Sequence, residues 1–157
     1  MTLRRIAATR ARHVEIVVDG CNPRTAAVLR QTARYVLDRE GMTRGRLEIV
    51  AVADRTMRAA HGRWMGKKDS TDVLTFDLGD RRNRMVDAVI MICRDVARRE
   101  ARRRGTSMMS ELQLYVTHGC LHLAGYDDRR SQESARMHRR EDEVLSELRG
   151  EPVYARR

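Results

Sequence analysis

The sequence predicts an α+β fold, a single domain in which a small mixed four-stranded sheet packs against about five helices. The chain has 157 residues, 41% of them hydrophobic and 34% charged, which is typical of one globular domain. Its first part carries four short β-branched runs, whereas the hydrophobic spacing from residue 94 onward is helical. We assign residues 1–12 to a basic N-terminal arm and residues 13–157 to the domain.

The predicted strands are short runs of Val, Ile and Leu that end at polar or glycine-containing turns. Asp19 and Gly20 end the first of these runs, and a polar turn at residues 66–70 precedes the third. The strands are expected at residues 13–18, 47–52, 72–76 and 86–92.

Helices are expected where apolar residues recur three and four positions apart. Pro23 suits the first position of a helix, and Gly41 suits the turn that ends it. In the last helix the charged run 139–142, Glu141 included, is expected to face water. The other helices are expected at residues 56–61, 94–104, 110–123 and 131–148.

The formal net charge of +10 favours a polyanionic partner, RNA or DNA, although arginine-rich surfaces also occur without one. Aromatic residues make up only 4% of the chain, so contact with phosphates is expected rather than base stacking. No run is apolar enough to span a membrane or to serve as a secretory signal, and no nucleotide cofactor is expected. Three cysteines without metal-type spacing suit the reducing cytoplasm.

The most informative segment is residues 118–128, which reads as a metal site. His118 and His122 are four residues apart and therefore share one helix face. Gly125 can end the helix and turn the chain, so that Asp128 returns a carboxylate to the same point. Two imidazoles and a carboxylate suit Zn²⁺, one per chain, and leave a fourth position open. An open position is typical of a catalytic site, which makes both histidines candidate catalytic residues.

Two alternatives concern the same segment. Asp128 could instead cap the helix that follows the turn. A zinc protease would need a general-base glutamate directly after the first histidine, but Gly119 occupies that position, which excludes this class. Asp127 is predicted to orient one of the ligand histidines without itself binding the metal.

The segment resembles the signature His-Gly-x-Leu-His-Leu-x-Gly-Tyr-Asp-His of the YbeY-like endoribonucleases, also described as ribosomal RNA maturation factors. The resemblance extends over roughly residues 13–148. At its last position the family has a third histidine ligand, whereas this chain has Asp128. The resemblance therefore implies a third ligand only if the Asp128 carboxylate takes the place of that histidine. The matching residues are His118, Gly119, Leu121, His122, Leu123, Gly125, Tyr126 and Asp127.

A second region, residues 64–76, resembles a family strand of the type Thr-Asp-Val-Leu-Ser-Phe and the Arg-Gly-Lys turn before it. Met65 stands where the family has an arginine proposed to act on the scissile phosphate. Methionine cannot stabilise charge, so Arg63, Lys67 and Lys68 become the candidates for RNA binding.

The resemblance implies a zinc-dependent, single-strand-type endoribonuclease that acts in 16S ribosomal RNA processing and ribosome quality control. Its partners would be ribosomal RNA and the small ribosomal subunit, in the cytoplasm. Met65 and Asp128 favour an alternative, a non-catalytic ribosome- or RNA-binding factor that retains a structural metal site.

Overall fold

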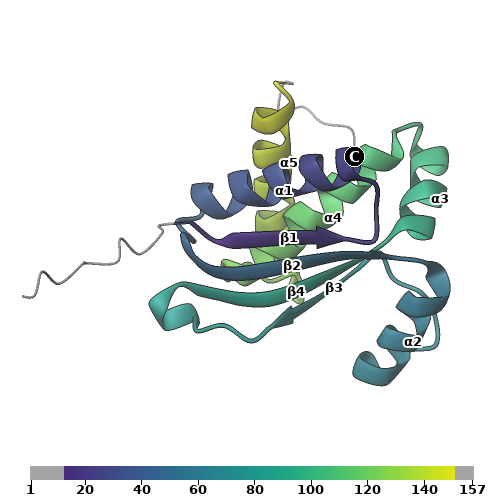
Figure 1. The fold of residues 1–157 in the computed structure, drawn as a ribbon, viewed down its shortest axis with the longest axis horizontal. Coiled ribbons are helices and arrows are strands. Elements are labelled where there is room, and N and C mark those ends of the chain that lie inside the picture. The colour runs from purple at the N-terminus through teal and green to yellow at the C-terminus, as the bar shows by residue number, and fades with distance from the viewer. Residues whose placement is uncertain (1–12, 151–157) are drawn as a thin grey trace, which may run out of the picture.

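A computed structural model describes residues 13–150, so the expected basic arm at residues 1–12 lies outside the described part. Four strands form one mixed sheet in the order β1-β2-β4-β3. β1 pairs parallel with β2, β2 pairs parallel with β4, and β3 pairs antiparallel with β4 (Figure 1). The predicted α+β fold with a mixed four-stranded sheet is therefore confirmed. The strands are β1 (Glu15–Asp19), β2 (Arg44–Val52), β3 (Val73–Asp77) and β4 (Met85–Cys93).

In the described part of the chain, five α-helices and one short 3₁₀ turn accompany the sheet. Asn22 caps the first helix by accepting a hydrogen bond from the Thr25 N–H at 2.8 Å, and Pro23 follows it. The second helix extends well beyond the expected residues 56–61. The bounds are α1 (Pro23–Arg39), α2 (Asp54–Met65), η1 (Arg81–Asn83), α3 (Arg94–Arg104), α4 (Met108–Leu123) and α5 (Ser131–Arg149). No helix within residues 13–150 is both long and apolar enough to cross a bilayer.

The two faces of the sheet bury different sets of residues, because successive side chains along a strand point to opposite faces. The main core lies on the face covered by α1 and α4, where Leu47, Ile49 and Ile90 are fully buried. A smaller cluster forms on the other face, where Met57 of α2 packs with Leu74 of β3. In Figure 1, α2 accordingly stands apart from the layer formed by α1, α4 and α5.

Helix α4 packs tightly against the sheet at Gly119. A Cβ atom there would lie 2.8 Å from Cδ1 of Ile90 and 3.0 Å from Oγ1 of Thr75. Glycine therefore lets α4 lie directly against β3 and β4. His118 and His122 project from another side of this helix, which α5 partly covers.

The expectation that Glu141 faces water is wrong, since only 1% of this residue is exposed. The helical repeat explains the burial, because position 141 lies one turn from Met137 and one turn from Val144 and Leu145, and all three are buried. The charge of the residue suggested a solvent-facing position, but the spacing decides which face it occupies.

Candidate metal centre

Three polar side chains converge where α4 ends. Nε2 of His118 lies 3.0 Å from Nε2 of His122. Oδ2 of Asp128 lies 3.3 Å from the first of these nitrogens and 3.6 Å from the second. The structure thus brings together all three residues that the sequence nominates as metal ligands, with their donor atoms within 4.8 Å of one another.

The loop after α4 carries Asp128 back toward the histidines. Gly125 adopts a φ of +101°, and the N–H of Tyr126 donates to the carbonyl of Leu121 at 3.0 Å, which ends the helix in a tight turn. The Asp127 carboxylate then accepts hydrogen bonds from the backbone N–H groups of Asp128 and Arg129. Helix α5 begins only at Ser131 with Arg130 as its N-cap, so Asp128 does not cap it.

Asp127 also pairs with the guanidinium group of Arg129 at 2.7 Å. The hydrogen bonds from Arg129 hold the pKa of the Asp127 carboxyl well below its usual range. These contacts stabilise the turn in the loop between α4 and α5. A direct role of Asp127 beside a ligand histidine stays a prediction.

The partners of the histidine Nδ1 atoms fix where the lone pairs point. Nδ1 of His122 lies 3.0 Å from the carbonyl oxygen of Tyr126, and Nδ1 of His118 lies 2.6 Å from Oε1 of Glu141. A carbonyl and a carboxylate only accept hydrogen bonds, so both Nδ1 atoms carry the proton. With both rings neutral, the Nε2 atoms present lone pairs to each other across 3.0 Å, an arrangement that a cation bound between them would stabilise.

The donor set fits Zn²⁺ in both spacing and chemistry. Tetrahedral zinc with bonds of about 2.0–2.1 Å places neighbouring donor atoms roughly 3.3 Å apart. The three separations found, 3.0, 3.3 and 3.6 Å, bracket that value. Two neutral imidazoles and one carboxylate also suit a borderline ion and leave one position open.

The two histidines differ in their electrostatic surroundings. Burial is the largest influence on His118 and lowers its pKa, but the hydrogen bond and charge of Glu141, together with the charge of Asp128, outweigh it, so the pKa is raised overall. Burial lowers the pKa of His122, and the neighbouring His118 ring lowers it further when that ring is protonated. The two imidazole rings are therefore not readily protonated to imidazolium at the same time. The negative charge around them favours a bound cation.

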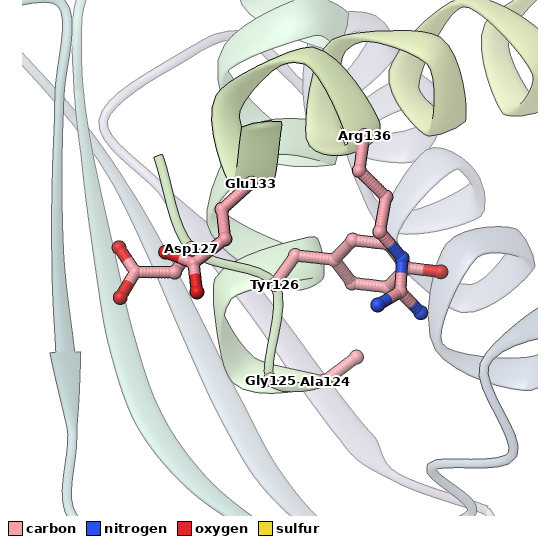
Figure 2. Close-up of a pocket in the computed structure, with 6 residues that line it drawn as sticks. All are labelled: Ala124, Gly125, Tyr126, Asp127, Glu133 and Arg136. Carbon is pink, nitrogen blue, oxygen red and sulfur yellow. The ribbon is translucent and has the colours of Figure 1, made fainter. Parts of the chain in front are cut away.

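A small hollow of about 160 Å³ adjoins the loop that carries Asp128. In Figure 2, Asp127 and Glu133 lie toward one side of it, and Tyr126 and Arg136 toward the other. The Arg136 guanidinium group lies 5.4 Å from the centre of the Tyr126 ring. The hollow thus combines both signs of charge with one aromatic face.

The RNA-binding candidates lie on a different element. Arg63 is in the last turn of α2, Lys67 and Lys68 follow that helix, and all three are exposed. Met65 is 59% exposed beside them. The role of these basic residues in RNA binding stays a prediction.

Sequence reasoning missed the network behind the site. Nε of Arg140 lies 2.6 Å from Oε1 of Glu40, and the Tyr126 hydroxyl donates to the other oxygen of Glu40 at 3.4 Å. These contacts connect α5, the end of α1 and the loop after α4. The burial of Glu141 could have been predicted from the sequence, because this acidic residue is in phase with an apolar helical stripe. The contact between Glu40 and Arg140 could not, because the two residues are 100 positions apart in the chain.

The fold and the site define a class of small α+β proteins with an open, three-ligand candidate metal site at the end of a helix. The family model described as "Endoribonuclease YbeY" matches residues 12–149. This chain belongs to that family.

Curated relatives agree with this assignment, and a solved structure shares the fold. An Endoribonuclease YbeY of Anaeromyxobacter sp. (strain Fw109-5) is 38% identical over 119 residues, which are 74% of this chain and 61% of the relative. One of Thermobifida fusca (strain YX) is 33% identical over 142 residues, 85% of this chain and 92% of the relative. A solution structure from Thermotoga maritima, 24% identical, has a TM-score of 0.61 over 91% of this chain and 96% of its own, and shares the fold.

Proposed function

We propose that this chain is a metal-dependent endoribonuclease that acts in the maturation of ribosomal RNA. One observation carries the proposal: two histidine Nε2 atoms 3.0 Å apart meet a carboxylate, in a chain of a family whose curated members are called endoribonucleases. The spacing of these donor atoms is compatible with a tetrahedral divalent cation.

His118, His122 and Asp128 would hold one Zn²⁺ per chain. Bound there, the ion would polarise a phosphate oxygen or lower the pKa of a bound water. Asp128 brings a negative charge that a histidine in its place would not, which weakens that effect. Arg63, Lys67 and Lys68 would contact phosphates of the RNA backbone, and the net charge of +10 would attract RNA from a distance.

We further propose 16S ribosomal RNA on the small ribosomal subunit as the substrate, with a role in ribosome quality control, and the cytoplasm as the compartment. The free thiols of Cys21, Cys93 and Cys120 support a reducing compartment.

Cleavage of a ribosomal RNA fragment by the zinc-loaded protein tests the proposal. The His118→Ala/His122→Ala variant should lose cleavage and zinc but keep its affinity for the RNA, because the basic surface is unchanged. His13→Ala, at an exposed position outside the site, is the matched control and should cleave normally. Undiminished cleavage by the double variant would refute the metal-dependent mechanism.

The second candidate is a ribosome- or RNA-binding factor that does not cut. The exposed side chain of Met65, at the position of the family's arginine, favours it. Met65→Arg separates the two: an enzyme should cleave without this change and faster with it. A wild-type protein that binds zinc and ribosomal subunits but cleaves no RNA with Zn²⁺, Mn²⁺ or Mg²⁺ would establish the binding factor.

A further inference from the structure

Glu141 is a buried carboxylate to which the proposed function assigns no role. Its Oε1 lies 2.6 Å from Nδ1 of His118, and its Oε2 lies 3.5 Å from Nδ1 of His138. The residue is 1% exposed. Burying a carboxylate costs free energy that an ion pair at best offsets, so stability alone does not account for its place.

Glu141 meets His118 on the side of the ring away from the candidate ligands. His118 faces His122 and Asp128 with Nε2, whereas it meets Glu141 with Nδ1. An ionised carboxylate accepts a hydrogen bond and cannot donate one, so it keeps the proton on Nδ1 and leaves the lone pair on Nε2. Glu141 thus sets both the tautomer and the orientation of this ring.

His122 offers an internal comparison. Its Nδ1 donates to the carbonyl of Tyr126, an acceptor without charge. The partner of His118 is negative, which makes its Nε2 the stronger electron donor of the two.

We propose that Glu141 is a positioning residue that holds the Nε2 lone pair of His118 on the metal and strengthens metal binding through its charge. The inference rests on the proposed metal-binding role of His118, His122 and Asp128. Glu141 acts through His118 and does not itself contact the ion.

Zinc affinity measured by competition with a chelator, without RNA, tests the inference. Glu141→Gln preserves the shape of the side chain but removes its charge, and it should weaken zinc binding about 10- to 100-fold. The control is Glu143→Gln on the same helix, whose side chain is 48% exposed and pairs with Arg140; its zinc affinity should equal that of the wild type. Unchanged affinity in Glu141→Gln would overturn the inference.

A second measurement needs no variant and covers the case in which Glu141→Gln does not fold. Imidazole ¹⁵N spectra of the zinc-loaded wild type should show a proton on Nδ1 of His118 and none on Nε2. The opposite tautomer would overturn the role of Glu141 while leaving the proposed function intact. A wild type that binds no zinc would refute the proposed function and, with it, this inference.

Discussion

At the scale of single residues, Gly119 shows how the fold restricts the chemistry. The position lies between the two histidines, where a general-base glutamate would stand in a zinc protease. Even the first carbon of a side chain would meet Ile90 and Thr75 at 2.8–3.0 Å, so glutamate does not fit there. The contact between helix and sheet therefore excludes the protease as firmly as the sequence does.

Gly119→Ala should destabilise the protein by about 1–3 kcal/mol, because the added methyl group overpacks the contact with Ile90 and Thr75. Urea unfolding measures the loss. In the Ile90→Val background, which removes the Cδ1 atom at 2.8 Å, the same change should cost less. Equal losses of stability in both backgrounds would show that the contact with Ile90 does not limit how closely α4 packs against the sheet.

Asp128→His replaces the carboxylate by the family's third ligand and removes one negative charge from the site. Zinc binding should persist, and cleavage should reach half its maximum at a lower pH, because a less negative ligand set lowers the pKa of a bound water. The pH–rate profile of the loaded protein is the measurement. Asp128→Ala, which supplies no ligand, should bind zinc more weakly than either protein.

The ligand set could be predicted from the sequence because its geometry is local. His118 and His122 are one helical turn apart, and Asp128 is six residues from His122 through a turn that Gly125 marks. Glu141 depends on how α5 packs across α4, which no short segment specifies. Whether Arg63 can replace the family's arginine, which is Met65 here, could not be predicted either. The position of Arg63 relative to the histidines depends on which face of the sheet α2 covers.

At the scale of elements, a polar cluster joins the beginnings of α2 and α3. Asp54, the first residue of α2, pairs with Arg99 of α3 at 2.5 Å, and its N–H donates to the carboxylate of Asp95 at 2.8 Å. Hydrogen bonds from Arg99 are the largest influence on Asp54 and hold the pKa of its carboxyl well below the usual range. This cluster fixes α2, and with it the basic residues that follow, against the rest of the fold.

Asp54→Asn should reduce the free energy of unfolding at neutral pH by about 1 kcal/mol. A carboxyl whose pKa is lowered in the folded state contributes stability above its ordinary pKa and loses it as the pH falls toward the folded value. The difference between wild type and variant should therefore shrink below about pH 4. Urea titrations at several pH values test this, and a constant difference would contradict it.

At the scale of the whole molecule, the hydrophobic core includes none of the three candidate metal ligands. It runs from β1 through α1 and α4 to α5 and includes fully buried Leu29, Ile49, Val116 and Val144. The element types and the mixed sheet could be predicted because apolar periodicity is strong in each segment. The pairing order could not, because it depends on contacts between strands far apart in the chain.

The chelator-treated protein should therefore stay folded and unfold in one cooperative step. Zinc at about 100 times its dissociation constant should add about 2.7 kcal/mol to the free energy of unfolding and raise Tm accordingly. Differential scanning calorimetry with and without zinc measures this, and His118→Ala/His122→Ala should show no increase. An unfolded metal-free protein would mean that the site is structural.

The order of the strands in the sheet has a consequence for synthesis. β4 is the partner of both β2 and β3, yet within residues 13–150 it is the last strand to be made. A nascent chain that ends before Met85 contains the β1–β2 pair, with the β2 edge that later pairs with β4 still open, and β3 without its partner. Such unpaired strand edges are prone to aggregate. The interval between the emergence of β3 and that of β4 is therefore when a growing chain most needs protection by chaperones.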